Sequence, residues 1–470
     1  MSSSTVDLTQ KDSGLRSGCL SFFEVLGQSI ANIAPTATPA ITIPVVFITA
    51  GNGTWVSYLF ATLAILFLSL QINVFAKRSA TPGALYTYIT QGLGAGGGFV
   101  SGSGLVLAYL VTGSAVLCGF ANYANNLLSY IGFQISPALL IFVGVVIAWL
   151  LTYKGVELSA RVMLIIETVS VSLIVILAVI VLFNHHFNLG SAQFTLKGVS
   201  FSNIQGGLVF AFFSFVGFES ATAMGNEAKK PLHNIPKAVL ISGAFVGIFF
   251  VVMSLVLVMG FTGSKSPLGS STAPLTYLAQ QSHVGIFGFL IDIGATVSFW
   301  SCSVACITAA ARVMLTMSDK GFLPKTIVKC HKTNKTPYIA TAVCAIVVGG
   351  VPVVLELLKN ANMDVYNWTG TLAVYGFLVS YLLIAVAAPI YLHRLKQLKP
   401  VNIITAIIAT IFVCIPLVGS VYPLPSYPAL LLPIIFLGWL ILSLVLYLIV
   451  NQRKPTLPTF QTGAEREIFE

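Results

Sequence analysis

Twelve long apolar segments divide this chain, and they restrict its possible folds more than any other feature. They lie at about 20–50, 55–76, 98–129, 136–153, 158–184, 204–227, 235–261, 283–317, 338–356, 366–391, 402–421 and 428–450. A helix of about 20 apolar residues crosses the hydrocarbon core of a bilayer. Membrane-spanning β-strands would instead alternate apolar and polar residues over about ten positions, and these segments do not alternate. The sequence therefore predicts an all-α polytopic membrane protein with twelve transmembrane helices.

The charged residues support this topology and exclude a soluble protein. Only 8% of the residues are charged and 56% are hydrophobic, which is too little charge to cover a globule of this size in water. With the N-terminus placed inside, every Lys and Arg except Lys197, Lys265 and Lys359 falls on the inner side. Positively charged connectors face the cytoplasm. We therefore expect a multi-pass protein of the cell membrane, embedded in the lipid bilayer, with both termini cytoplasmic. The net charge of +10 then reports topology and indicates no nucleic acid partner.

The spans are predicted to form one membrane domain at 19–450, between a disordered cytoplasmic tail at 1–18 and a second cytoplasmic tail at 451–470. The sequence holds no intramembrane His/Asp cluster, no metal-ligand spacing and no reactive Ser motif. It therefore predicts no enzyme, no metal centre and no cofactor. A channel would need a recurring filter segment. A twelve-span carrier of the facilitator superfamily would place a long loop between spans six and seven, where only 228–235 are available.

Two of the predicted spans contain residues that break helices. The first holds Pro35 and Pro39 within a small and polar stretch at 27–39, and each proline removes a backbone donor and displaces a carbonyl group. The sixth holds Gly217 next to Glu219 in the middle of the membrane. A kinked structural helix would explain either feature alone. Two breaks that lie five spans apart, and so run in opposite directions, are typical of transporters built from inverted repeats.

Several segments of the chain resemble the amino acid–polyamine–organocation permeases. The residues that carry the resemblance are Phe213–Ser220, Glu227–Pro231, Asn234–Ala238, Thr81–Tyr88, Ala311–Val313, Asp319–Pro324 and Thr336–Pro337. The resemblance implies a 5+5 inverted-repeat, LeuT-like fold. Its repeats would cover about 20–184 and 204–392, and two peripheral helices would cover about 402–450.

The same resemblance implies a site on unwound backbone of the first and sixth spans, which would bind the α-carboxylate and α-amino groups of a substrate. By position, the substrate-binding residues would be Ser29, Ile30, Ala31, Asn32, Ile33 and Ala34 from span one, with Phe215, Val216 and Gly217 from span six. Phe213 would also bind the substrate, as the aromatic residue that closes over the occupied site. Glu219 would be the acid tied to gating or proton movement.

The sequence departs from the family pattern at two places. Ala31-Asn32-Ile33 replaces the usual glycine-rich break, so Asn32 is expected to contact the substrate directly. Many proton-coupled members carry a lysine midway along the fifth span, and Ser170 occupies that position here, with Glu167 one turn earlier. Glu167 is interpreted either as a replacement for that lysine or as a partner of a helix neighbour.

Other polar residues of the spans leave alternatives open. Ser301 lies with Ser298 and Ser303 in span eight, where the hydroxyls suit either a sodium ion or close helix packing. Cys302 and Cys306 share a helix face and are interpreted as small packing residues. Two further acids, Glu24 and Asp292, are interpreted as residues of the cytoplasmic mouth and of an outer vestibule.

The function predicted from these features is secondary-active amino acid transport by alternating access, coupled to a cation, with the proton as the expected co-ion and Na⁺ as the other. The alternative is an amino acid or polyamine exchanger, or an uncoupled facilitator, which the missing lysine permits. The substrate is a small molecule, and neutral amino acids, cationic amino acids and polyamines all remain open.

Overall fold

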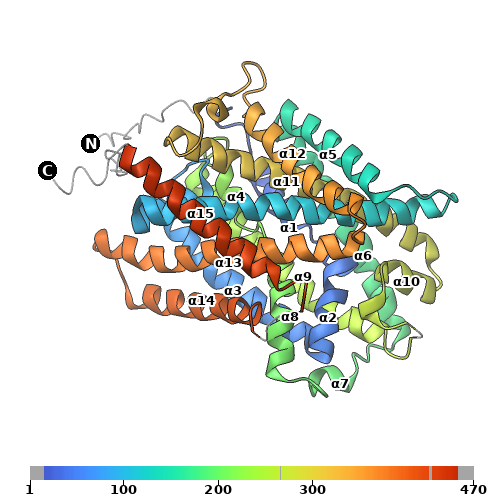
Figure 1. The fold of residues 1–470 in the computed structure, drawn as a ribbon. Helices are drawn as coiled ribbons and strands as arrows, with labels where there is room; N and C mark the ends of the chain where they lie inside the picture. Colours follow the sequence, from blue (N-terminus) through green and yellow to red (C-terminus); the bar gives the residue numbers. More distant parts are fainter. Residues whose placement is uncertain (1–14, 265, 423–425, 454–470) are drawn as a thin grey trace, which may run out of the picture.

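The apolar segments form long helices in the computed structural model, which describes residues 15–264, 266–422 and 426–453 (Figure 1). The helices of the first half are α1 (Phe22–Ile33), η1 (Thr38–Thr42), α2 (Ile43–Ala50), η2 (Gly51–Gly53), α3 (Thr54–Ala76), α4 (Ala84–Ser129), α5 (Pro137–Lys154), α6 (Val156–Asn184) and α7 (Ser191–Phe194). The second half begins with α8 (Phe201–Phe213), η3 (Ser220–Met224), α9 (Pro231–Gly260), η4 (Leu268–Ser270), α10 (Pro274–Gln281), α11 (Gly285–Asp319) and η5 (Lys325–Val328). The last helices are α12 (Tyr338–Leu357), α13 (Asn362–Arg394), α14 (Pro400–Gly419) and α15 (Leu431–Arg453).

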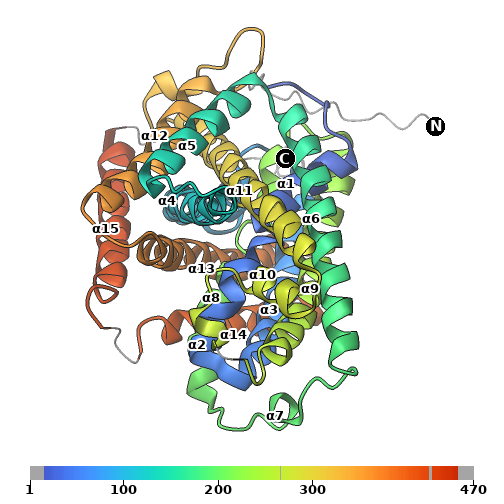
Figure 2. The same cartoon turned by 90° about the vertical axis from the view of Figure 1, so that its right-hand side faces the viewer.

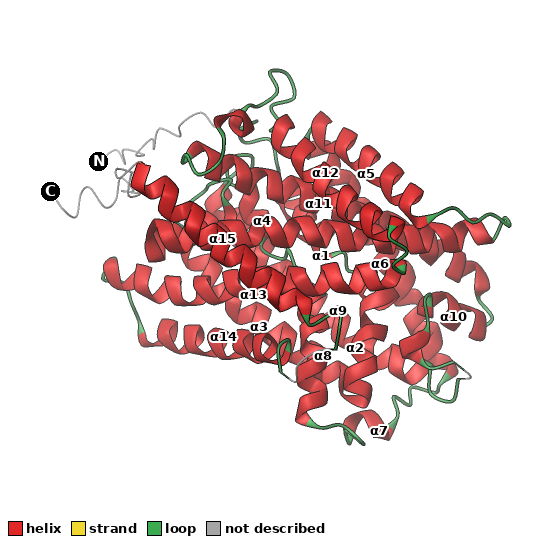
Figure 3. Cartoon of the chain, in the orientation of Figure 1, coloured by secondary structure: helices red, strands yellow, loops and turns green. Residues whose placement is uncertain are grey.

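The described chain is all-helical, as predicted (Figure 3). Its one extended pairing is an isolated bridge between Leu20 and Ala228. Ten described segments are long and apolar enough to cross a membrane, and the first of them, Phe22–Ala76, contains both the first and the second predicted spans. The sixth predicted span is split into α8 and η3. The count of twelve spans stays a prediction. Of the predicted tails at 1–18 and 451–470, residues 1–14 and 454–470 lie outside the described residues.

The third span starts earlier than the apolar pattern indicates. Its helix α4 begins at Ala84 rather than near residue 98, and it bends at Gly94, where φ is 82°. Small and polar residues fill the stretch before residue 98, so its apolar content is too low to mark a span. The longest helices, α4, α11 and α13, form the centre of the bundle, and Figure 2 looks along α4 and α13.

The two C-terminal helices lie at the edge of the bundle. Within its most apolar stretch, α4 is 89% buried, whereas α14 is 22% and α15 only 11% buried. Figure 2 shows α15 along the outer edge, next to α13. An apolar helix that the rest of the protein leaves uncovered is suited to contact lipid. These helices are therefore peripheral, in agreement with the LeuT-like arrangement.

Hydrogen bonds join the connectors of the chain into two sets at opposite ends of the bundle. At one end, Gly18 N bonds Asn226 O (3.3 Å), Arg78 Nη2 bonds Gln397 Oε1 (3.0 Å) and Thr336 Oγ1 bonds Tyr153 O (3.0 Å). At the other end, Asn52 Nδ2 bonds Lys197 O (3.0 Å), Trp55 Nε1 bonds Gln193 O (3.1 Å) and Asn122 Nδ2 bonds Thr272 O (3.2 Å). The first set contains connectors rich in Lys and Arg, and we call that end the basic side. Each of these bonds thus joins segments of the same end that are distant in the sequence.

Candidate substrate site

The first span is interrupted in its middle. Helix α1 ends at Ile33, Ala34 has the left-handed conformation (φ 49°, ψ 67°), and the helix resumes as the π-helical turn η1 at Thr38. The proline that follows Ala34 explains the position, because a residue before proline is disfavoured in the α region. We call residues 34–37 the first-span break. It starts later than expected, since Ser29–Ile33 remain helical and only Ala34 of the predicted unwound residues leaves the helix.

The sixth span is interrupted beside it. Helix α8 ends at Phe213, and η3 starts at Ser220. Gly217 lies between them with φ 87°, a conformation that glycine adopts without steric cost. We call residues 214–219 the sixth-span break. The predicted interruption at Phe215–Gly217 falls inside it.

The two interrupted spans cross in direct contact. A Cβ atom built on Gly217 would lie 2.3 Å from Nδ2 of Asn32, so only glycine allows this approach. Ser29 Oγ donates to the Phe218 carbonyl (2.8 Å) and accepts from Ala221 N (3.2 Å). Through these two hydrogen bonds, Ser29 links the first span to the sixth. In Figure 1, α2 and α8 lie side by side and run across the direction of the long helices.

A small central cavity lies between the two breaks. Its volume is about 20 Å³, which is room for about one water molecule. The lining residues are Asn32, Ile33, Ala34, Ala37, Thr38 and Thr42 from the first span, Phe213, Ser214 and Val216 from the sixth, and Thr112, Val116, Phe299, Cys302 and Tyr366 from α4, α11 and α13. None of these side chains is charged. An amino acid is much larger than this cavity, so its entry requires the walls to move apart.

Five of the predicted substrate-binding residues line the central cavity: Asn32, Ile33, Ala34, Phe213 and Val216. The other five, Ser29, Ile30, Ala31, Phe215 and Gly217, are not among its lining residues. They are buried next to it, and their roles toward a substrate stay predictions.

Asn32 offers the cavity an unused donor. Its carbonyl oxygen accepts from the Cys302 thiol (3.1 Å) and its Oδ1 accepts from the Cys306 thiol (3.0 Å). Its Nδ2 is buried and has no hydrogen-bond partner among the described residues. A buried donor without a partner is costly, so the site is suited to an acceptor on a ligand. Of the two thiols, interpreted from the sequence as packing residues, Cys306 thus also orients the side-chain amide of Asn32, and Cys302 bonds its backbone.

Aromatic residues close the cavity on the side opposite to the basic side. The Phe213 ring lies edge-on to the Tyr366 ring (5.9 Å between centroids), and Tyr366 shares a hydrogen bond with Thr42 (3.1 Å). Next to them, Tyr123 donates to the Ala40 carbonyl in η1 (2.9 Å) and stacks on Phe299. Phe213 is therefore placed where a closing residue would act, although this role stays a prediction.

Ion pairs and backbone bonds close the basic side. Arg312 donates from Nε to Glu227 Oε2 (2.7 Å) and from Nη2 to Glu227 Oε1 (2.9 Å), and both side chains are at most 2% exposed. Leu20 N bonds the Glu227 carbonyl (2.8 Å), so the segment before α1 is tied to the same residue. Glu24 pairs with Arg161 (2.5 Å) across α1 and α6. Contacts on both sides thus hold the walls of the central cavity together.

Glu219 ends the sixth-span break and joins it to the centre of the bundle. Its carboxylate is fully buried. Tyr109 of α4 donates to Oε1 (2.6 Å), and Tyr381 of α13 donates to Oε2 (2.7 Å). A carboxylate only accepts hydrogen bonds, whereas a carboxylic acid must also donate one. A change of its protonation state would therefore rearrange these contacts.

Glu167 is the centre of a second buried cluster of hydrogen bonds, at the first-span break. Thr36 donates to Oε2 (3.1 Å), Ser301 donates to Oε1 (3.3 Å), and Ser298 also donates to Oε1. The carboxylate thereby joins α6 and α11 to the first span. Ser170 is packed against Gly294 of α11. The structure therefore brings together Glu167 and Ser301, two of the four predicted coupling residues, while Glu219 lies in the other cluster.

Several residues of the site carry too little sequence signal to be found. The lining residues missed by the sequence analysis are Ala37, Thr38, Thr42, Thr112, Val116, Ser214, Phe299, Cys302 and Tyr366. Thr38 and Thr42 follow the prolines of the first span at helical spacing, which is the one signal that could have included them. Val116 and Phe299 resemble any other apolar residue of a membrane helix.

Comparisons with known proteins agree with this architecture. A branched-chain amino acid permease of Bacillus subtilis, BcaP, is 26% identical over 440 residues, which cover 87% of this chain and 88% of the relative. A methylthioribose transporter of the same organism is 26% identical over 73% of this chain and 76% of that protein. Mouse cationic amino acid transporter 4 is 23% identical over 78% of this chain and 59% of its own length.

A solved structure shares the fold. It is the substrate-bound outward-open state of a Na⁺-coupled sialic acid symporter, with a TM-score of 0.52 and 13% identity, and the match covers 88% of this chain and 93% of that one. A likeness at this identity concerns the fold alone. The family model described as "Amino acid permease" matches residues 24–456, which is nearly all of the membrane domain. This multi-pass membrane protein is therefore a member of the amino acid permease family.

Proposed function

We propose that the protein is a secondary-active transporter that carries a neutral amino acid across the cell membrane by alternating access. The observation that carries this proposal is the small central cavity between two helix breaks, with the unpaired amide donor of Asn32 facing it. A cavity this small must widen before it can admit a substrate. In alternating access, a central site of this kind opens to one side of the membrane at a time.

The cavity favours a neutral substrate with an apolar side chain. Val116, Val216 and Phe299 form apolar walls, and no carboxylate among the lining residues is available to bind a second amine. The α-carboxylate would accept from Asn32 Nδ2 and from backbone N–H groups near the breaks, and free carbonyl groups would receive the ammonium group. The similarity to a branched-chain amino acid permease supports this class. Cationic amino acids, polyamines and methylthioribose are the competing candidates.

A counterflow panel tests the substrate class. Purified protein in proteoliposomes preloaded with leucine should take up labelled leucine, and unlabelled leucine, isoleucine or valine should compete. We expect arginine, putrescine and methylthioribose at the same concentration to leave uptake unchanged. Absence of leucine counterflow would overturn the proposal, and counterflow of labelled arginine or of labelled methylthioribose would then assign one of the competing classes.

We infer that the two halves move against each other around the cavity. The proposed repeats, about 20–184 and 204–392, each contain one break, and α14 and α15 stay outside this movement. The excess of Lys and Arg at the basic side supports a cytoplasmic position for that side and for both termini. Opening toward the cytoplasm would then separate Glu227 from Arg312, and opening outward would move Phe213 from Tyr366.

The proposed coupling ion is the proton, carried at Glu219. The carboxylate accepts from Tyr109 and Tyr381, on two long helices, while its backbone belongs to the sixth-span break. Because protonation changes which group donates, it can bias the break toward one arrangement. Glu167 with Ser298 and Ser301 is the second oxygen cluster that could respond to a cation, H⁺ or Na⁺. An exchanger or an uncoupled facilitator is the alternative, since Ser170 replaces the lysine of proton-coupled relatives.

Glu219→Gln separates coupled from uncoupled transport. The amide keeps the size of the side chain but cannot release a proton, so we expect a pH gradient to drive no accumulation of leucine above the outside concentration, while leucine counterflow persists. Asp364→Asn, which changes an exposed carboxylate at the start of α13, should keep both activities. If Glu219→Gln still accumulates leucine against its gradient, Glu219 is not the coupling acid.

A further inference from the structure

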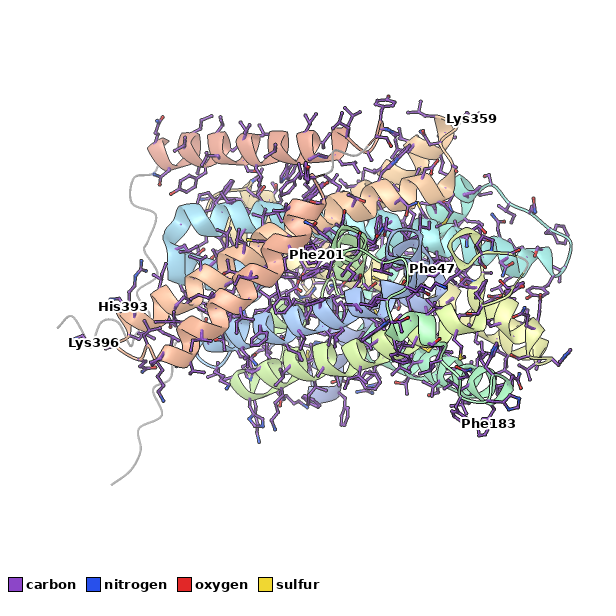
Figure 4. The ribbon with its side chains drawn as sticks, turned by 90° about the horizontal axis from the view of Figure 1, so that it is seen from below. Phe47, Phe183, Phe201, Lys359, His393 and Lys396 are labelled. Atoms are coloured by element: carbon purple, nitrogen blue, oxygen red, sulfur yellow. The ribbon has the colours of Figure 1, made fainter. Side chains whose placement is uncertain are left out.

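A large pocket on the basic side lies apart from the substrate site. It has a volume of about 820 Å³ and is formed by the end of α3, the end of α13, the connector 395–399 and the start of α14. Figure 4 shows Lys396, which lines it, next to His393 at one end of the bundle, with Lys359 at the other end. Pockets of about 300–1,000 Å³ hold drug-sized ligands, so this one exceeds the needs of a small ion.

The charge of the pocket has one sign. Four cationic side chains line it, and no carboxylate does: they are Lys77, Arg78, Lys396 and Lys399. They come from two connectors that are distant in the sequence. All four are exposed, so water and salt weaken their mutual repulsion, but their summed positive charge favours an anionic ligand over a neutral or cationic one.

Arg78 is held in place at this pocket. Its Nη1 donates to the Val74 carbonyl (2.5 Å), and its Nη2 donates to Gln397 Oε1 (3.0 Å) in the other connector. A guanidinium group has five N–H donors, so further donors stay available for a ligand. A planar, fixed guanidinium group is well suited to two oxygens of one phosphate group.

The pocket also has an apolar wall and a buried acceptor. Leu70 and Val401, 44% and 58% exposed, line it with other apolar residues, and Val401 belongs to the weakly buried helix α14. Asn73 lines the pocket as well, and its Oδ1 is buried without a partner among the described residues. An acyl chain would cover the apolar wall, whereas Asn73 Oδ1 is too deeply buried to meet a ligand unless the helices rearrange.

We propose that this pocket binds an anionic phospholipid, with its phosphate on Arg78 and the three lysines and an acyl chain against α14. The place of the pocket, where apolar helices end in a basic connector, is where lipid headgroups lie. The bound lipid would tie the peripheral helix α14 to α3 and α13. The site is independent of the central cavity and of the proposed substrate.

The experiment measures the thermal stability of the purified full-length protein in detergent with increasing phosphatidylglycerol. We expect a saturable rise in the melting temperature, and for Lys396→Gln/Lys399→Gln an increase of about tenfold or more in the lipid concentration needed for half of it. Lys329→Gln/Lys332→Gln removes the same charge from another exposed part of the same side and should behave as the wild type. Phosphatidylcholine should give no saturable rise.

Two results would overturn the proposal. One is equal protection of the wild type and the Lys396→Gln/Lys399→Gln variant by phosphatidylglycerol, which would place the lipid elsewhere. The other is equal protection by inorganic phosphate without lipid, which would assign the pocket to a soluble phosphate-bearing anion. Because the readout is stability, failure of the proposed transport function would leave this test intact.

Discussion

Replacing Gly217 with Ala is expected to lower leucine uptake per folded transporter by about 100-fold. The new Cβ would lie 2.3 Å from Nδ2 and 2.5 Å from Cγ of Asn32, and the backbone at Gly217 has φ 87°. The left-handed conformation costs a non-glycine residue about 1–2 kcal/mol, and overpacking costs about 1–3 kcal/mol. Asn32 cannot move aside freely, because its oxygen atoms accept from the thiols of Cys302 and Cys306. The substitution therefore disturbs the unpaired amide donor that Asn32 offers the cavity.

Gly198→Ala provides the matched control for this prediction. Gly198 also has a positive φ, of 76°, but a Cβ atom built there has nothing within 4 Å. Gly198→Ala carries the same backbone cost without a steric clash, so leucine uptake by this variant should stay close to that of the wild type. Uptake is normalised to monodisperse protein from gel filtration. Near-normal uptake by Gly217→Ala would mean that the contact between Asn32 and the sixth-span break is dispensable.

Replacing Arg312 with Met is expected to destabilise the protein by about 3–5 kcal/mol, because it leaves the carboxylate of Glu227 buried without its partner. Arg312 makes two hydrogen bonds to that carboxylate and one to the Thr308 carbonyl (2.9 Å). The Glu227 backbone also holds Leu20. Loss of the pair should therefore loosen the closure of the basic side as well as lower the melting temperature.

The second ion pair of the basic side supplies the control. Glu24, whose side chain is 7% exposed, pairs with Arg161, whose side chain is 64% exposed. Ser21 N also donates to the Glu24 carboxylate (2.7 Å), so this carboxylate keeps a backbone partner when Arg161 is replaced. Arg161→Met should thus lower the melting temperature far less than Arg312→Met. Combining Arg312→Met with Glu227→Leu should recover much of the lost stability, since neither charge remains. Equal falls in the melting temperature of Arg312→Met and Arg161→Met would show that burial does not increase the contribution of the Arg312–Glu227 pair to stability.

The helix breaks could be predicted because their causes are local. Pro35 restricts the residue before it, and Gly217 permits a backbone that other residues avoid. The sequence predicts too early a start for the first break, because the small and polar residues at Ser29–Ile33 look unsuited to a membrane helix. In the structure these residues face protein, where Ser29 finds Phe218 and Ala221 and the helix is preserved.

The partners of the buried acids could not be predicted in the same way. Tyr109 and Tyr381 lie 110 and 162 residues from the end of the sixth-span break to which they donate. Nothing in a single sequence says which tyrosine of a span will turn toward a given carboxylate. The sequence does mark Ser301 and Glu167 as unusual polar residues within spans, but it does not pair them. Their contact depends on how α6 packs on α11, which only the structure shows.

The most direct measurement of the central claim is a structure of the purified protein with saturating leucine, determined by electron cryo-microscopy. We expect density for leucine between the first-span break and the sixth-span break, its carboxylate within hydrogen-bond distance of Asn32 Nδ2 and its side chain against Val116 and Phe299. Density for leucine at another place, with the central cavity still at its closed size of about 20 Å³, would contradict the account.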